Sequence, residues 1–167
     1  MQCNIKDFLF DEMQQITGLE VITPEQMMDY IYGVLNSPFY VDKFNDLLKQ
    51  NYPRVAYPKD KEFFLKVSEL GMQLRLVHLC EIEQGSGTTI LLKKPKHIEN
   101  KIILNDEYQI EDIDDSLYNF KIGACPVIKN WLKARQDEEI ILEELLLIIN
   151  KCKETIRIRT ELDKCWN

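Results

Sequence analysis

Paired cysteines, long apolar runs and a basic N-terminus are all missing from this sequence. Its five cysteines are odd in number, and no two of them form a CxxC pair. This count and spacing indicate neither a disulfide framework nor a zinc site. No apolar run reaches the length of a membrane-spanning helix, and the opening MQCNIKDFLFDEM carries acids where a signal peptide needs bases. We therefore expect a cytoplasmic protein that meets no membrane.

Motifs typical of catalytic, cofactor-binding and metal-binding sites are missing as well. The sequence has no GxGxxG, HExxH or GxSxG pattern. The stretch GSGTT at 85–89 looks like the end of a phosphate loop, but it lacks the lysine and the upstream glycine, and no helix is expected after it. His78 beside Cys80 fits a helix end with one buried thiol better than a metal or nucleophile pair. Asp112, Asp114 and Asp115 lack EF-hand spacing and fit a solvated loop.

Charge is distributed unevenly along the chain. The net charge of −7 argues mildly against a free-standing DNA-binding domain. Residues 51–104 nevertheless carry nine bases against six acids, and residues 116–135 carry four bases and no acid. Between them, residues 105–115 carry six acids and no base. An anionic partner should therefore meet the two positive stretches.

The first half of the chain has helical periodicity. Helices are predicted over 5–17, from Thr23-Pro24 to about residue 36, over 39–50, and over 60–80. Two prolines keep 52–58 extended. The third helix is expected to bury Phe39, Phe44, Leu47 and Leu48. The fourth has an unbroken apolar seam, and Gly71 within it permits close packing of another element; the seam residues are Phe63, Val67, Leu70, Leu74 and Val77.

The second half mixes strands and helices. Strands are predicted at 88–92 and 101–104, a hairpin over 101–110 and a further strand over 118–122. Tyr118, Phe120 and Trp131 are expected in the core. Helices follow from Pro126 to about Arg135 and over 137–162, where the apolar run 145–149 predicts a central position or a partner. The prediction is one α+β domain over 1–167, helical over 1–80, β-rich over 86–123 and helical over 125–163, with the helices flanking a small antiparallel sheet.

Several stretches resemble one enzyme family in order along the chain. Residues 28–40, MDYIYGVLNSPFY, resemble the block YIYAVLHSPxYR, and 52–60, YPRVAYPKD, resemble FPRIPLPKD. Residues 70–79 are similar to LGxxLxxLHL, 118–135 to WxFxIGGYxxxxKWLKxRKGR, and 155–163 to ETIRLMxEID. These blocks belong to the C-terminal specificity domain of type ISP restriction–modification enzymes and related adenine-specific DNA methyltransferases.

The resemblance implies a DNA target-recognition module at the end of a larger polypeptide. Its partners would be double-stranded DNA and a methyltransferase domain, preceded in some members by an ATP-driven translocase and a nuclease. The chain lacks the glycine-rich cofactor loop and the proline-flanked tetrad that hold S-adenosylmethionine and a flipped base, so we expect no cofactor in this chain and none of the parent enzyme's catalytic residues. The family pattern is broken at Asn36, at 123–126 and at 135–138, and 81–112 matches poorly; 81–112 is our candidate for the part that reads sequence.

Three groups of bases are candidates for contact with DNA. Bases beside the double-proline segment fit either phosphate contacts or a solvated loop; they are Arg54, Lys59 and Lys61. The densest basic cluster, held extended by Pro95, is Lys93, Lys94, Lys96 and His97. In the short helix after Pro126, Lys129 and Lys133 are i, i+4 neighbours that repel unless something anionic faces them, and Arg135 follows. We expect 93–97 and 129–135 to form one basic surface, with the acidic hairpin turn pointing away.

Two alternatives to direct DNA recognition stay open. A protein-interaction module that docks the recognition region onto the methyltransferase domain would explain the acidic balance and the apolar run 145–149. An independent small enzyme is disfavoured by the missing motifs.

Overall fold

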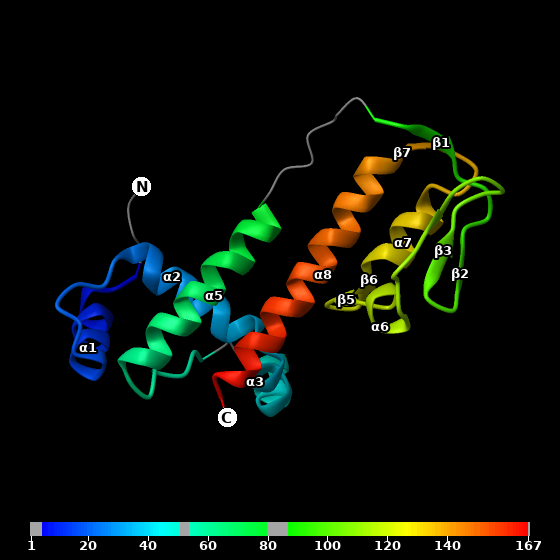
Figure 1. The fold of residues 1–167 in the computed structure, drawn as a ribbon. Helices are drawn as coiled ribbons and strands as arrows, with labels where there is room; N and C mark the ends of the chain where they lie inside the picture. The colour runs from blue at the N-terminus through cyan, green and yellow to red at the C-terminus, as the bar shows by residue number, and fades with distance from the viewer. Residues whose placement is uncertain (1–4, 51–53, 80–86, 167) are drawn as a thin grey trace. The chain divides into compact units, whose positions relative to one another are not determined.

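The computed structural model describes residues 5–50, 54–79 and 87–166. Helices lie at both ends of the chain and small antiparallel sheets lie between them, which confirms the predicted α+β class (Figure 1). The chain divides into two compact units. Unit 1 is Met1–Cys80 together with Glu154–Asn167, and unit 2 is Glu81–Lys153. Among the described helices, none is both long and apolar enough to cross a membrane.

Unit 1 is helical, and its helix ends follow local sequence rules. The helix α1 ends at Gly18, which has φ +67° and therefore takes a left-handed conformation that glycine tolerates best. The helix α2 begins with a capping box, in which Thr23 and Gln26 bond each other's backbone N–H groups. The helices are α1 (Asp7–Thr17), α2 (Pro24–Asn36), α3 (Pro38–Lys43), α4 (Asn45–Gln50), α5 (Lys61–Leu79) and the C-terminal turns of α8 (Leu142–Lys164).

The core of unit 1 forms around the seam of α5, as predicted. Four of its five seam residues are buried, and Val77 is partly buried against the same cluster. Packed against the seam are Met27, Tyr30 and Val34 of α2, and Ile158 and Leu162 of α8. Figure 1 shows α2 and α5 side by side, in agreement with their many close approaches. The long helix 60–80 is thus a packing element.

Leu74→Ala is expected to destabilise the protein by about 3 kcal/mol, since Leu74 is fully buried and its loss leaves a cavity. Urea unfolding, followed by circular dichroism, measures the change. Leu76→Ala on the same helix is the control, because Leu76 is exposed. A loss below about 1 kcal/mol for Leu74→Ala would mean that the seam carries little of the stability.

The prediction of a single helix over 39–50 is wrong in detail. Two short helices, α3 and α4, replace it, because Phe44 at φ −112° and ψ 15° leaves the helical conformation. Phe39 is 37% exposed and stacks on Trp166, with ring centroids 5.4 Å apart. Leu47 is 59% exposed, whereas Phe44 and Leu48 are partly buried as expected. Residues 54–58 form neither helix nor strand, in agreement with the prediction that this segment is not helical.

The described part of unit 2 contains three small antiparallel sheets and two short helices, besides the start of α8. Its sheets pair β1 with β7, β2 with β3 and β4, and β5 with β6. The predicted hairpin over 101–110 is confirmed as β3–β4, with a turn in which Asn105 Oδ1 accepts bonds from two backbone N–H groups. The elements are β1 (Thr89–Leu91), β2 (Lys96–Ile98), β3 (Lys101–Ile103), β4 (Gln109–Ile110), α6 (Asp115–Tyr118), β5 (Lys121–Ile122), β6 (Cys125–Pro126), α7 (Val127–Ala134), β7 (Glu139–Ile141) and the N-terminal turns of α8.

Two predictions in this region are wrong. The strand expected over 118–122 is reduced to β5, because Asp114 caps α6 by accepting a bond of 2.7 Å from the Leu117 N–H. The long helix expected from residue 137 begins only at Leu142. The preceding residues form β7, since Ile140 pairs with Ile90 of β1. The helix predicted after Pro126 is confirmed as α7.

Candidate nucleic-acid interface

A buried ion pair joins α2 to α5 in unit 1. Arg75 Nε lies 2.6 Å from Asp29 Oδ1, and Arg75 Nη2 lies 3.1 Å from Asp29 Oδ2. The hydrogen bond to Asp29 raises the pKa of the Arg75 guanidinium. Asp29 is only 5% exposed, so this carboxylate faces the protein interior and cannot contact a ligand in solvent. Both residues belong to stretches that carry the family resemblance.

A second polar contact links the same two stretches to a third, 155–163. The Tyr32 hydroxyl lies 2.6 Å from His78 Nδ1, and His78 Nε2 lies 3.2 Å from Thr155 Oγ1. Burial raises the pKa of Tyr32. His78 is therefore part of a structural network, whereas Cys80, suggested beside it, lies outside the described residues. Within the described ranges, no three His, Cys, Asp or Glu side chains are grouped as a metal site requires.

The turn between α2 and α3 binds the end of α8. Asp163 Oδ1 accepts bonds from the Ser37 hydroxyl at 3.0 Å and from the Phe39 backbone N–H at 2.9 Å. Arg159 Nε donates to the Asn36 carbonyl oxygen at 3.1 Å. The stretches 28–40, 70–79 and 155–163 thus meet inside unit 1, and the side chains named in them act as scaffold.

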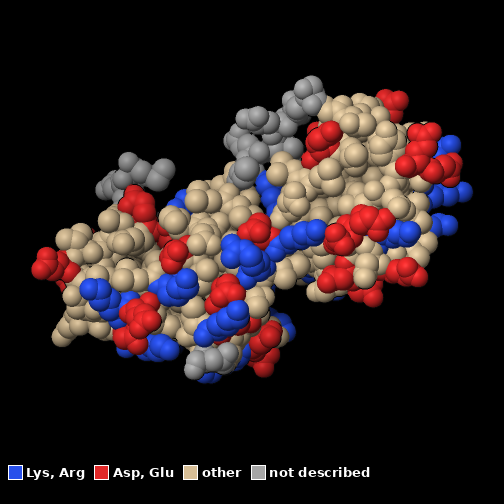
Figure 2. Space-filling model, viewed as in Figure 1, with Lys and Arg blue, Asp and Glu red and all other residues tan. Residues whose placement is uncertain are grey.

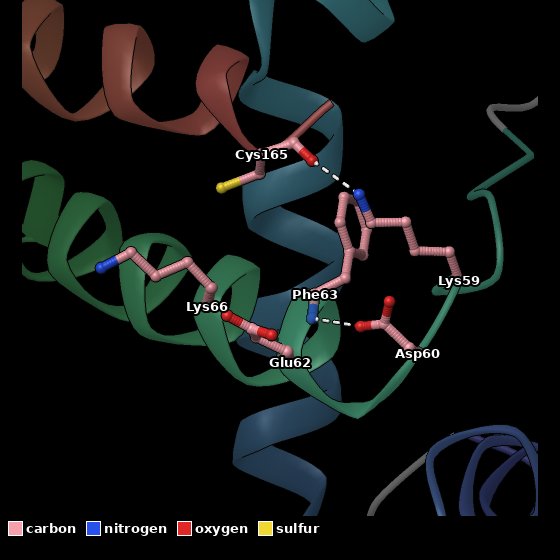
Figure 3. Close-up of a pocket in the computed structure, with 6 residues that line it drawn as sticks. All are labelled: Lys59, Asp60, Glu62, Phe63, Lys66 and Cys165. Atoms are coloured by element: carbon pink, nitrogen blue, oxygen red, sulfur yellow. Dashed lines mark hydrogen bonds between the residues drawn. The ribbon is translucent and has the colours of Figure 1, made fainter. Parts of the chain in front are cut away.

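The surroundings of the candidate bases of unit 1 carry no excess of positive charge. Arg54 is exposed, and its carbonyl oxygen accepts a hydrogen bond from the Tyr40 hydroxyl. Lys59 Nζ lies 3.4 Å from the Cys165 carbonyl oxygen and 5.3 Å from the Phe63 ring centroid. Figure 3 shows Lys59 at one side of a hollow of about 270 Å³; its lining is Lys59, Asp60, Glu62, Phe63, Lys66 and Cys165. Two lysines face two carboxylates there, so the hollow has no net attraction for an anion.

The segment 93–97 presents three lysines to solvent and turns its histidine inward. Lys93, Lys94 and Lys96 are exposed. The His97 side chain is 8% exposed, and its Nε2 lies 2.7 Å from the Ile113 carbonyl oxygen. His97 also lies 3.4 Å from Asp115. The three lysines, without His97, form the accessible part of the predicted cluster.

The prediction that the acidic hairpin turn points away from this segment is wrong. Lys93 lines a hollow of about 340 Å³ together with Asp106 and Glu107 of the turn. Leu92 exchanges backbone hydrogen bonds with Asp137 and Glu138 at 2.8 and 2.9 Å, which brings a further acidic run close to Lys93. The turn is held near β1 because Asn105 Nδ2 donates to the Leu91 carbonyl oxygen at 2.8 Å.

The helix α7 carries only bases among its charged residues. Ile128 and Leu132 are buried, and the residues that follow them, Lys129 and Lys133, are exposed. Arg135 follows the helix and stacks on Trp131, with its guanidinium carbon 4.3 Å from the ring centroid. Trp131 is only partly buried, so it supports Arg135 as well as packing against the unit. Stacking holds the guanidinium in place while its N–H groups keep their donor capacity.

The candidate bases of unit 2 share one property. In the described part of the chain, none of them lies within 4.0 Å of a carboxylate oxygen as a salt bridge requires; they are Lys93, Lys94, Lys96, Lys129, Lys133 and Arg135. In unit 1, Lys66, Arg75, Arg157 and Lys164 are each paired with an acid, whereas the candidate bases Arg54, Lys59 and Lys61 also have no salt bridge within the described residues. The bases of unit 2 are therefore available to an anion from outside.

On the face of unit 2 seen in Figure 2, Lys and Arg side chains lie together at the right edge, and Asp and Glu side chains lie among the bases elsewhere. The common basic surface of 93–97 and 129–135 stays a prediction, and the 93–96 lysines and the α7 bases are treated below as two patches.

The left-handed backbone conformations in unit 2 were not predicted from the sequence. Among the described residues, four that are not glycine have positive φ, and all four lie in this unit: Lys94, Glu99, Asp112 and Asp137. Lys94 has φ +45°. A left-handed conformation costs about 1–2 kcal/mol for a residue with a Cβ, and such residues gather at functional sites. The left-handed backbone at Lys94 therefore makes that lysine a candidate for a functional role.

Comparisons with known proteins agree on one relationship. A model of the Type ISP C-terminal specificity domain matches residues 1–160. Among solved structures, the Type ISP restriction–modification enzyme LlaGI, as a nuclease-deletion mutant in complex with a DNA substrate mimic, matches 85% of this chain with a TM-score of 0.61 and 23% identity. The ATP-dependent Type ISP enzyme LlaBIII bound to DNA matches 89% with a TM-score of 0.59 and 20% identity. This chain covers 16% and 12% of those two chains. No curated protein matches it.

Proposed function

The chain belongs to the family of Type ISP C-terminal specificity domains, and from that membership we propose that it recognises target DNA for a restriction–modification methyltransferase that modifies adenine. The observation that carries the proposal is the family match over residues 1–160. The parent enzyme's methyltransferase part would bind S-adenosylmethionine and perform the transfer. This chain would supply contacts to double-stranded DNA and no catalytic residue.

The two units have different roles in this proposal and act as one recognition region. Unit 1 is the scaffold, because the stretches shared with the family are used there in buried pairs such as Asp29–Arg75. Unit 2 contacts DNA in this proposal because it holds most of the candidate bases, and its lysines and Arg135 among them are exposed or half-buried and have no salt bridge within the described residues. Lys129, Lys133 and Arg135 form one phosphate-contacting patch, and Lys93 and Lys94 form the other, with the exposed Lys96 beside them in β2. Such contacts position a protein on DNA without reading its sequence.

Titration of labelled duplex DNA with the full chain tests the proposal. Affinity should be measurable at low salt and should fall steeply as salt rises, because each phosphate neutralised by a base releases condensed counterions. Arg54→Ala and Lys59→Ala belong in the same series, since these exposed bases of unit 1 remain candidates for phosphate contact. Absence of binding even at low salt would contradict the proposal and favour the docking function described next.

A docking function has one specific observation in its favour. Four apolar residues of α5 are exposed, and their spacing of seven, four and three places them on one face of the helix; they are Leu65, Met72, Leu76 and Leu79. Such a stripe fits contact with another protein surface, which here would be the methyltransferase domain. Replacing Met72 and Leu76 with serine should leave DNA binding intact and weaken binding to that domain.

Lys94→Gly is expected to strengthen the fold while it weakens DNA binding. Glycine relieves the left-handed strain at φ +45° but costs more chain entropy, so we expect a net gain of about 0.5 kcal/mol in the free energy of unfolding. Lys94→Ala keeps the strain and loses the same charge. Urea melts and duplex titrations of both variants measure the two effects. If both bind duplex DNA as tightly as the natural chain, Lys94 contacts no phosphate.

A further inference from the structure

The three-stranded sheet of unit 2 has two different faces. Its register pairs Lys96 with Ile103, Ile98 with Lys101, and Ile103 with Gln109. Directly opposed residues of antiparallel strands lie on the same face, and successive residues alternate between faces. One face, which we call the outer face, therefore carries Lys96, Ile98, Lys101, Ile103 and Gln109.

The opposite face is packed onto unit 2. Ile102 is fully buried. His97 stacks on Tyr118 of α6, with ring centroids 4.3 Å apart and an interplanar angle of 8°, and burial raises the pKa of the Tyr118 hydroxyl. These contacts hold the sheet firmly, so its outer side chains are presented on a fixed frame. In Figure 1 the β2–β3 hairpin lies at the far right, at the edge of unit 2.

The outer face is accessible and basic. Lys96, Ile98 and Gln109 are exposed, Ile98 by 44%, and Lys101 and Ile103 are partly exposed. Neither lysine has a salt bridge within the described residues. One neighbouring acid is Glu111, whose Oε1 accepts a bond of 2.7 Å from Gln109 Nε2 and so orients that amide, and another is Glu99, which follows Ile98 in the turn. The outer face thus combines two lysines, an amide and two isoleucines on one side of a sheet.

We propose that the outer face enters the major groove of duplex DNA and reads base edges there. The major groove admits a two-stranded ribbon, and the side chains match its code: lysine donates to guanine O6 and N7, glutamine pairs with adenine, and an apolar group contacts the thymine methyl. This inference rests on the proposed function and assigns the sequence-reading surface within it. The face lies within 81–112, the stretch that resembles the family least.

The test uses the full chain and a library of duplexes with a randomised centre. Rounds of binding and amplification identify the sequence that the natural chain enriches. Lys96→Ala and Gln109→Ala should each lower affinity for that sequence about tenfold while affinity for unrelated duplexes changes much less. Ile98→Ala should relax one position of the enriched sequence. Ile122→Ala is the matched control, because Ile122 is also an exposed isoleucine of unit 2, 56% accessible, but lies outside the sheet.

Dimethyl sulfate then locates the contact. It methylates guanine N7 in the major groove and adenine N3 in the minor groove, and the bound chain should protect N7 in a manner that Lys96→Ala removes. Unchanged enrichment and N7 reactivity in the sheet variants would overturn the inference while salt-dependent binding still supports the proposed function. Protection confined to adenine N3 would also overturn it. Absence of any duplex binding would contradict both the proposed DNA-recognition function and the sequence-reading role of the outer face.

Discussion

Gly71→Ala is expected to destabilise unit 1 strongly, although alanine is the better helix former. A Cβ at Gly71 would lie 1.9 Å from the Asp29 carbonyl oxygen and 2.9 Å from the Gly33 backbone nitrogen. These are backbone atoms of α2, which cannot rotate away, so α2 and α5 would have to separate. Helix propensity alone favours alanine by about 1 kcal/mol. We expect a net loss of about 3 kcal/mol or more, as for severe overpacking of a core.

Tryptophan fluorescence can report this loss for unit 1 alone. The chain has two tryptophans, Trp131 in unit 2 and Trp166 in unit 1. In a Trp131→Phe background, urea melts of Gly71→Ala therefore follow Trp166, which packs on Phe39 and Phe63. Met72→Ala, at the exposed neighbouring position, serves as the control and should change stability little. A Gly71→Ala protein as stable as its parent would show that the two helices do not cross as closely as described.

Arg75→Met is expected to cost about 3–5 kcal/mol, because it leaves the buried Asp29 carboxylate without its charged partner. Asp29→Ala should cost less. The Arg75 side chain is 32% exposed and can recover hydration when Asp29 is removed. The larger effect should therefore come from the residue that is less buried, which is the reverse of what burial alone would suggest.

The double variant Asp29→Ala, Arg75→Met completes a thermodynamic cycle. Because removal of both charges leaves no unpaired group, its loss should be smaller than that of Arg75→Met alone. Urea melts of the four proteins measure the coupling. If the two single losses simply add up to the double loss, the pair contributes no interaction energy and the contact is incidental.

Local chemistry made much of unit 1 predictable. Thr23 and Pro24 mark the start of α2, and Gly18 marks the end of α1, through bonds that span only a few residues. The buried seam of α5 could be predicted from the helical spacing of its apolar residues alone. Gly71 suggested a close approach, although the partner helix could not be identified from the sequence.

Long-range pairing explains most of what the sequence did not predict. Residues 139–141 become β7 because β1, about fifty residues earlier, supplies their hydrogen-bond partners. The same applies to β2, which was expected only as an extended segment and forms a strand against β3. In the candidate site, the sequence identified the bases by charge. It could not predict that Asp106 and Glu107 lie beside Lys93, since tertiary contacts of the hairpin turn decide that position.

The salt dependence of duplex DNA binding by two charge-matched variants tests the central claim most directly. Lys129→Ala with Lys133→Ala removes two exposed bases of α7, and Lys6→Ala with Lys49→Ala removes two exposed bases of unit 1. Both variants change the net charge equally. The proposal predicts that the α7 variant lowers the slope of log affinity against log salt by about 2, as for two lost phosphate contacts, while the unit 1 variant keeps the natural slope. Equal slopes for the natural chain and both variants would contradict contact between α7 and DNA phosphates.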